Sequence, residues 1–350
     1  MSEGRGSTPA RPKDHISTPD AVQTVLPRWR GFNLLEMFSA ERAGEFRKDD
    51  FCWLADWGFD FVRLPMSYRV WTEPGDPLAV REAPLENVDR AVRLGEKYGV
   101  HVCLNLHRAP GYCINRGELE PFDLWKDAEA LDAFCFHWDL FARRYRGIPP
   151  KRLSFDLVNE PPHPTTEGMT RADYERVVRA AVAAIRARDP ERLIIADGVS
   201  VATEPCPELT DLGIAQSCRA YAPSGLSHYK ASWVRSEGWP EPTWPGALHS
   251  GEPWDRTRLE RFYEPWAELA RRRIGVHCGE GGAYSHTPHD VVLRWLRDVL
   301  EILTAHGIGY ALWNLRGPFG ILGPGRADVA YEDWHGHKLD RELLELLQEF

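Results

Sequence analysis

The stretch "FDLVNEPPHP", residues 155–164, decides which fold this chain can adopt. Its apolar residues are too dense for burial on one side only, so they predict a strand that is covered on both faces. The strand runs directly into Asn159 and Glu160, and the prolines behind them end it. A buried carboxylate is costly unless it is paired or has a function. The other strands of the chain show which of the two applies.

Seven further apolar runs have the same character. They lie at 30–34, 60–65, 100–106, 193–197, 216–221, 274–278 and 308–313, and with 153–158 they make eight. Amphipathic helical patterns separate most of them, and the clearest keeps a 3.6-residue period over 171–190 until Pro190 ends it. Parallel strands that are covered by helices satisfy this alternation, and eight of them close into a barrel.

An open, doubly wound sheet is the alternative architecture. It would usually carry a glycine-rich phosphate turn after the first strand, whereas the chain reads "LLEMFSAERAG" there. We therefore predict an α/β protein with a single-domain (β/α)8 TIM barrel over residues 25–350 and long βα loops. Residues 1–24 are polar and are expected to form a flexible tail.

Composition restricts the partners. The net charge of −9 argues against nucleic acid or an anionic membrane surface, and no apolar run reaches the roughly 18 residues of a membrane span. The N-terminus lacks the apolar core of a secretory signal, so we expect a cytoplasmic protein, or a secreted one if a leader has been removed. Seven scattered cysteines without a CxxC pair fit a reducing compartment. We expect no metal and no cofactor, and the oligomeric state stays open.

The carboxyl ends of the strands of a barrel carry its catalytic groups. Polar residues gather at these predicted ends, strand by strand: Asn33 and Glu36, Arg63, Asn105 and His107, Asn159 and Glu160, Asp197, Arg219 and Tyr221, Glu280, and finally Trp313 and Asn314. The opposite ends offer nothing comparable. This concentration on one rim predicts an active site there.

Two glutamates stand out at this rim. "VHCGEGGAY", residues 276–284, repeats the pattern of the opening stretch, with glycines around Glu280 that let the backbone approach a ligand. Glu160 and Glu280 follow strands four and seven, nearly opposite in an eight-stranded ring. Carboxylates about 5–5.5 Å apart suit retaining glycoside hydrolysis, and about 6.5–9.5 Å suits inversion. We expect Arg63 and Tyr221 to donate to Glu280, and Asn159 to hold a sugar hydroxyl.

Several motifs in barrel order resemble one known family. "RGFN", "FVRLP", "NLH", "LVNEP", a tyrosine after strand six, "GEGG" and "ALWN" occur in this order within residues 28–345. Together they resemble glycoside hydrolase family 5, the cellulase-like branch of the retaining (β/α)8 glycosidases. The resemblance implies that Glu160 is the acid/base and Glu280 the nucleophile. It also implies supporting roles for the residues at the other matching positions: Arg63, His107, Asn159, Tyr221 and Trp313.

One position departs from the pattern of the family. The family usually has His-x-Tyr at the end of strand six, whereas this chain reads "RAYAPSGLSH" over residues 219–228. Tyr221 and His228 fit the pattern, but Arg219 replaces the histidine. A permanent cation there would keep a carboxylate ionised or pair with an acidic group of the rim. The pH behaviour and the substrate choice of the family therefore do not transfer directly.

Long loops at the rim supply further candidates. Loops beyond about 15 residues are usually functional or disordered, and the connection over 222–254 holds four tryptophans: Trp233, Trp239, Trp244 and Trp254. Their indole faces would stack on pyranose rings, or they would pack the loop onto the barrel. The loop after strand three offers Tyr112, Asn115 and Arg116, and Glu36 would bind hydroxyls in a terminal subsite. Loops on several sides favour a pocket over an open groove.

Several functions compete at this stage. The leading one is retaining hydrolysis of β-linked oligo- or polysaccharides of the cellulose or mannan type by double displacement. An exo-acting β-glycosidase on small glycosides or glycolipids is the first alternative. A non-catalytic carbohydrate-binding barrel is the second, but it would lose one of the glutamates. A metal-dependent barrel enzyme would need a third acidic ligand where Arg219 stands, and the "HTPHD" run at 286–290 matches no common metal motif.

Overall fold

The computed structural model of the chain describes residues 24–115 and 119–350. The predicted tail therefore lies outside the described residues except for Thr24. The backbone N–H of Thr24 donates to the carbonyl oxygen of Arg273 at 2.9 Å, and Thr24 forms a parallel bridge with Ile274. This residue is therefore tied to the barrel.

A closed ring of parallel strands forms the centre of the described structure. The ring follows the order β2-β1-β13-β12-β9-β8-β7-β5, and pairing of β2 with β5 closes it. Its members are β1 (Arg30–Asn33), β2 (Phe61–Ser67), β5 (His101–Ala109), β7 (Leu153–Asp156), β8 (Leu193–Asp197), β9 (Ala215–Ala220), β12 (Val276–Gly281) and β13 (Gly309–Leu312). The predicted (β/α)8 barrel is confirmed, with strand ends that differ from the prediction by a few residues.

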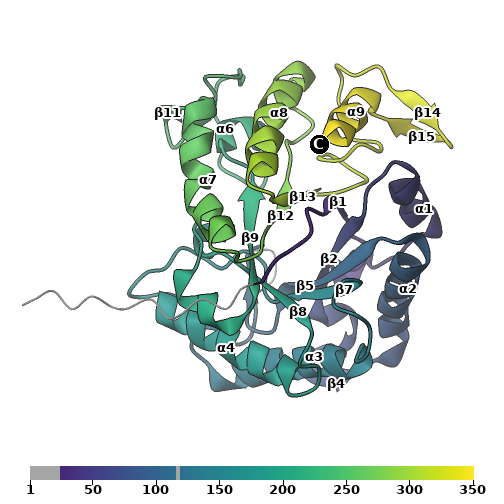
Figure 1. Cartoon of the computed structure of the whole chain (residues 1–350), viewed down its shortest axis with the longest axis vertical. Helices are drawn as coiled ribbons and strands as arrows, with labels where there is room; N and C mark the ends of the chain where they lie inside the picture. The colour runs from purple at the N-terminus through teal and green to yellow at the C-terminus, as the bar shows by residue number, and fades with distance from the viewer. Residues whose placement is uncertain (1–23, 116–118) are drawn as a thin grey trace, which may run out of the picture.

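Helices surround this ring, as Figure 1 shows. They are α1 (Lys48–Asp56), α2 (Glu82–Tyr98), α3 (Ala128–Arg144), α4 (Arg171–Arg186), α7 (Arg256–Arg271), α8 (His289–Ala305) and α9 (Arg341–Glu349). Helix α4 begins with a capping box in which Thr170 and Asp173 satisfy each other's backbone N–H groups. It ends four residues before Pro190, in keeping with the conformational restriction that proline imposes on its predecessors.

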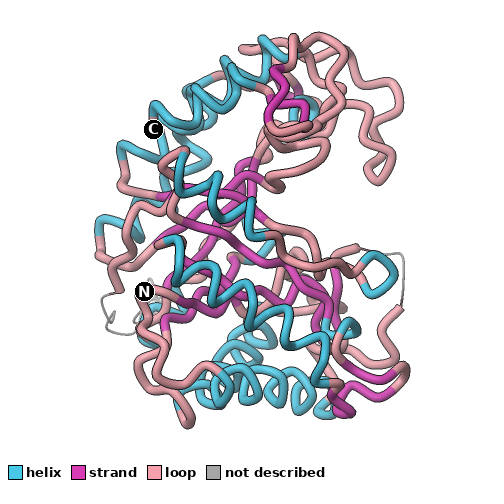
Figure 2. Tube along the Cα trace, turned by 90° about the vertical axis from the view of Figure 1, so that its right-hand side faces the viewer, coloured by secondary structure: helices cyan, strands magenta, loops and turns pink. Residues whose placement is uncertain are grey.

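Shorter elements decorate the loops. They are α5 (Val199–Ala202), α6 (Ser224–Ser227), the 3-10 turns Ala40–Arg42, Tyr68–Val70 and Pro207–Leu212, and the short strands β3 (Thr72–Glu73), β4 (Asp76–Val80), β6 (Tyr112–Cys113), β10 (Leu248–His249), β11 (Glu252–Pro253), β14 (Glu332–Trp334) and β15 (His337–Leu339). Figure 2 shows long irregular segments that extend beyond the strands at one end of the barrel. Among the described helices, none is long and apolar enough to cross a membrane.

Aromatic rings close the amino-terminal end of the barrel. Trp29 stacks on His101 with ring centroids 3.8 Å apart, and Phe61 lies 4.4 Å from His277. Burial lowers the pKa of both histidines to about 3, so they are neutral core residues at ordinary pH. The interior of the barrel is therefore closed by uncharged rings at this end, and the strands deliver their last residues at the opposite end.

Close packing of β1 against β2 yields a stability prediction. A Cβ atom on Gly31 would lie 1.7 Å from the carbonyl oxygen of Phe61, which belongs to the backbone and cannot rotate away. We expect Gly31→Ala to lower the free energy of unfolding by about 2 kcal/mol or more, because overpacking forces backbone shifts. Urea unfolding measures the change. Gly44→Ala is the control, since a Cβ there would meet nothing within 4 Å, and equal losses in the two variants would contradict the prediction.

Candidate active site

A buried guanidinium organises the carboxyl ends of the strands. Arg63, on β2, is 1% exposed. Its Nε donates to Asp156 Oδ2 at 2.7 Å, its Nη1 to Glu280 Oε1 at 2.5 Å, and its Nη2 to Asn159 Oδ1 at 2.9 Å. One side chain thereby connects β2 with β7, with the segment behind β7 and with β12.

A second buried guanidinium, that of Arg219 on β9, touches both glutamates. Its Nε donates to Glu160 Oε1 at 2.9 Å, and its Nη2 lies 3.3 Å from Glu280 Oε1. Both of its Nη groups also bind the carboxylate of Asp197. The two glutamates, which come from opposite sides of the ring, are therefore brought to one guanidinium.

The charges of this network do not balance. Two arginines face four buried carboxyl groups, those of Asp156, Asp197, Glu160 and Glu280. Burial, and next the negative charge of Glu280, raise the pKa of Glu160 to about 8, although Arg219 opposes the shift. Burial and Asp197 likewise raise the pKa of Asp156 to about 7. Glu160 therefore carries a proton at neutral pH, which a general acid requires.

The backbone of Glu160 is held on both sides. Its φ of 48° lies in the left-handed region, which costs a non-glycine residue roughly 1–2 kcal/mol. The N–H of Glu160 donates to Asp197 Oδ2 at 2.8 Å, and the hydroxyl of Tyr112 donates to its carbonyl oxygen at 2.5 Å. These two bonds fix the direction in which the carboxyl group leaves the backbone.

Glu280 is surrounded by donors. Besides the two arginines, the hydroxyl of Tyr221 lies 3.2 Å from its Oε2. Arg63 and Tyr221 thus make the contacts with Glu280 that the sequence suggested.

The glycines beside Glu280 also have a reason in the packing of the barrel. A Cβ on Gly279 would lie 2.7 Å from Ser217 Oγ and 3.3 Å from Arg219 Nη1, and one on Gly281 would lie 2.6 Å from the Cβ of Ala220. These two glycines make room for Arg219 and for strand β9, and the close approach of a ligand stays a prediction.

A cavity of about 880 Å³ opens above this network, and both glutamates line it. Most of the predicted site residues line it as well, namely His107, Asn115, Arg219, Tyr221, His228, Trp233 and Trp313. Arg63, Asn159 and Tyr112 do not line the cavity, but they hydrogen-bond to the glutamates or the arginines. The site therefore has a polar base and a wall that the loops contribute.

One expectation about an individual residue needs correction, and another stays a prediction. Asn159 does not line the cavity, and its Oδ1 accepts from both Arg63 and Arg219 at 2.9 Å, whereas its Nδ2 has no partner; a bond from Nδ2 to a sugar hydroxyl therefore stays a prediction. Glu36 does not line the cavity either; burial and the carboxylate of Asp50 raise its pKa to about 7. A terminal subsite at Glu36 is therefore not supported. Arg116 lies outside the described residues.

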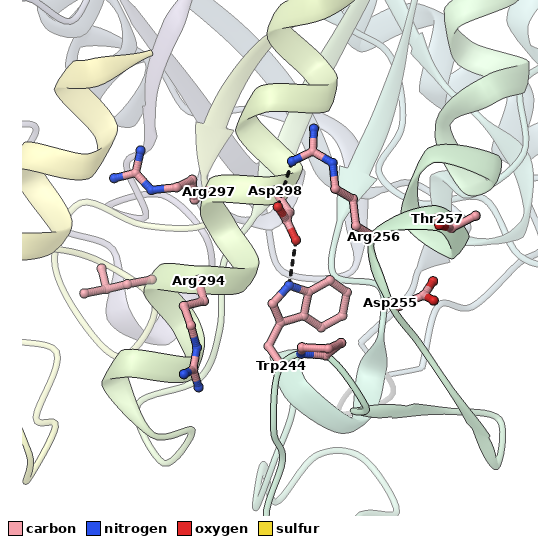
Figure 3. A pocket seen from close by; sticks show the side chains of 9 residues that line it. Trp244, Asp255, Arg256, Thr257, Arg294, Arg297 and Asp298 are labelled. Atoms are coloured by element: carbon pink, nitrogen blue, oxygen red, sulfur yellow. Dashed lines mark hydrogen bonds and ion pairs between the residues drawn. The ribbon is translucent and has the colours of Figure 1, made fainter.

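The loop tryptophans were expected either to stack on sugar rings or to pack the loop onto the barrel, and they differ in where they lie. Trp233 lines the cavity and is 55% exposed, whereas Trp239, Trp244 and Trp254 do not line it. Figure 3 shows Trp244 beside α8, where its Nε1 donates to Asp298 Oδ2 at 2.8 Å. This bond holds the loop that carries Trp244 against the helix. Trp244 lines a second cavity, of about 540 Å³, between its loop and helices α7 and α8. This cavity shares no lining residue with the cavity of the glutamates.

Some functional residues escaped the sequence reasoning. Asp156 binds Arg63, and the sequence signal for it was an aspartate inside an apolar strand. Phe38 lies 4.6 Å from His107 and 5.7 Å from Trp313 between ring centroids, but nothing in its loop marked it. Within residues 24–115 and 119–350, no group of three or more His, Cys, Asp or Glu side chains is placed to hold a metal ion.

A (β/α)8 barrel with two buried glutamates at the carboxyl ends of its strands is the arrangement expected of a glycoside hydrolase. Comparison with known families agrees: the model described as cellulase, glycosyl hydrolase family 5, matches residues 22–317. The chain belongs to this family, as its motifs suggested.

Individual relatives are similar over most of their length. Cellodextrinase A of Ruminococcus flavefaciens is 26% identical over 77% of this chain and 79% of its own. Endoglucanase C of Acetivibrio thermocellus is 25% identical over 85% of this chain and 92% of its own. A crystal structure of a glycoside hydrolase is 43% identical with a TM-score of 0.88, covering 92% and 99% of the two chains. Endoglucanase Cel5A of Thermotoga maritima, at 21% identity over 91% and 96% with a TM-score of 0.74, shares the fold.

Arg219 should influence the pH above which kcat/KM falls, the basic limb of the pH profile. If Glu160 is the acid, kcat/KM falls as the pH rises through its pKa. Because Arg219 lowers that pKa, Arg219→Gln should move the basic limb to higher pH while lowering the maximum of kcat/KM. Arg219→Lys keeps a cation, so it should move the limb less. The pH dependence of aryl β-glycoside hydrolysis measures this, and an unmoved limb in Arg219→Gln would contradict it.

Proposed function

We propose that this protein is a retaining β-glycosidase that releases β-linked glucosyl units by double displacement. The observation that carries the proposal is the contact of one guanidinium, that of Arg219, with both glutamates. Burial and the negative charge of Glu280 raise the pKa of Glu160, which favours the protonated form that a general acid needs. The glucosyl glycone is supported by the relatives named cellodextrinase and endoglucanase.

In the first step, the carboxylate of Glu280 attacks the anomeric carbon. The bond from this carbon to the glycosidic oxygen breaks, and Glu160 donates its proton to that oxygen as the leaving group departs. Arg63 and Tyr221 hold Glu280 at fixed positions, so little reorganisation accompanies the attack. The product is a glycosyl ester on Glu280.

In the second step, Glu160 acts as a base. Esterification removes the negative charge of Glu280, which is the second largest cause of the raised pKa of Glu160. The pKa of Glu160 therefore falls when the ester forms, and its carboxylate then takes a proton from the water that attacks the anomeric carbon. The bond from the anomeric carbon to the oxygen of Glu280 breaks as the water adds, which releases the sugar and returns Glu280 to the carboxylate. The charge of Glu280 thus favours the protonated form of Glu160 before the ester forms, and its loss favours the ionised form afterwards.

Replacement of each glutamate should have a different effect on two substrates. Glu280→Gln should lower hydrolysis of both benzyl and 2,4-dinitrophenyl β-cellobioside by several orders of magnitude, because no nucleophile remains. Glu160→Gln should lower kcat/KM for the benzyl glycoside by roughly 10²–10⁴-fold. It should affect the dinitrophenyl glycoside much less, because dinitrophenolate departs without a proton. Release of cellobiose measures both reactions.

Glu36→Gln serves as a matched control, because this glutamate is also partly buried but does not line the cavity. It should retain activity close to that of the wild type on both substrates. Activity that survives in Glu160→Gln and Glu280→Gln alike would place the chemistry elsewhere on the rim. A panel of β-mannosides and β-xylosides, assayed beside the glucosides, tests the glucosyl glycone separately.

A further inference from the structure

The segment behind β8 has an unusual backbone. Ser200, Val201 and Ala202 have φ values of 57°, 62° and 55°, so three consecutive non-glycine residues are left-handed. This conformation is a genuine outlier for the β-branched Val201. Each such residue is expected to cost about 1–3 kcal/mol, and strain of this kind gathers at ligand sites. Residues 200–202 form the left-handed turn.

The left-handed turn is tied to the acid/base. The N–H of Val201 donates to the carbonyl oxygen of Pro161 at 2.8 Å, and that of Ser200 donates to Pro162 at 3.2 Å. Pro161 directly follows Glu160, so these bonds place the turn beside the residue that protonates the glycosidic oxygen. The group attached to that oxygen must leave past this part of the wall.

The side chain of Val201 faces the cavity and is 37% exposed. Helix α7 covers the same part of the wall: a Cβ on Gly198 would lie 2.5 Å from the ring of Trp266, and Phe262 is one helical turn away on the same face. Phe262 lines the cavity together with Val201, Val234 and Ala222. This part of the wall therefore presents hydrocarbon.

Three polar side chains, those of Thr203, Ser224 and His249, also belong to this wall. The hydroxyl of Thr203 donates to the carbonyl oxygen of Ser200 at 2.7 Å. Nδ1 of His249 accepts from the N–H of Ser224 at 3.1 Å. Few polar groups are thus available for the hydroxyls of a pyranose ring at this place, and each buried, unpaired hydroxyl is unfavourable.

The opposite part of the cavity is different. His107, Asn115 and Asn314 line it beside Trp313, so it offers amide and imidazole groups together with an indole face. Such a mixture suits a sugar, whose hydroxyls need partners and whose ring face is apolar. The glycone therefore belongs at this end and the leaving group at the left-handed turn.

We infer that the leaving-group side of the cavity, formed by Val201, Phe262, Val234 and Ala222, takes an apolar aglycone, an alkyl or aryl alcohol, in preference to a second sugar. This inference rests on the proposed β-glycosidase activity. The strain of the left-handed turn is maintained because it directs Val201 into the cavity. Val201 is thereby a specificity-determining residue.

Alkyl β-D-cellobiosides test the inference. Methyl, butyl, hexyl and octyl cellobiosides, kept below their critical micelle concentrations, have leaving groups of nearly equal acidity but different apolar area. We expect kcat/KM for release of the alcohol to rise with chain length, by up to about fourfold per methylene while the chain stays in contact. Hexyl cellobioside should also be cleaved more efficiently than cellotriose. When cellotriose is cleaved to cellobiose, the leaving group is glucose instead of hexanol.

The variant Val201→Asn tests whether the left-handed turn causes the rise of kcat/KM with chain length. Asparagine tolerates a positive φ, so the variant should fold at least as stably as the wild type, while its amide removes apolar surface. We expect the dependence of kcat/KM on chain length to flatten by half or more. Val25→Asn is the control, because Val25 is 64% exposed and does not line the cavity, and it should keep the slope of the wild type.

Three outcomes would overturn the inference in distinguishable ways. A flat alkyl series in the wild type, or faster cleavage of cellotriose than of hexyl cellobioside, would reject the apolar aglycone alone. A steep series that Val201→Asn leaves unchanged would reject the role of the left-handed turn. Failure to hydrolyse any alkyl or aryl glycoside would reject the proposed function itself, and with it this inference.

Discussion

The imbalance between two buried guanidiniums and four buried carboxyl groups is the constraint on which the site depends. Arg63 and Arg219 cross-link β2, β9, β12 and the segment behind β7, so the same bonds that hold the mouth of the barrel also place the glutamates. Removal of one partner from such a buried network is usually strongly destabilising. Structure and chemistry therefore depend on the same side chains in this protein.

This constraint also explains how two glutamates come to differ. Both are buried and both touch Arg219, yet Glu280 has Arg63 and Tyr221 as well, whereas Glu160 has the carboxylate of Asp197 near its backbone N–H. Environment rather than residue type separates the two roles. Arg219 is a fixed charge where the motif of the family has a titratable histidine, so its effect on the pKa of Glu160 does not change with pH, whereas that of the neighbouring carboxylates does.

Backbone strain gathers at the same end of the barrel. Glu160 and residues 200–202 have positive φ, and hydrogen bonds between the two segments hold both in place. The floor of the barrel, by contrast, is closed by stacked aromatic and neutral histidine rings. Four of the described non-glycine residues with positive φ therefore lie beside the glutamates, where strain is expected to serve function.

The sequence by itself determined the barrel, the strands that form it and the two glutamates, because hydrophobic periodicity and polar residues at strand ends are local patterns. It also marked Arg63, Arg219 and Tyr221 at their strands. Only the tertiary structure decided that Asn159 orients arginines, that Glu36 does not line the cavity, that Gly279 makes room for Arg219, and that Val201 faces the cavity. These outcomes depend on contacts between side chains of strands and loops that are far apart in the sequence, and no local sequence pattern specifies such contacts.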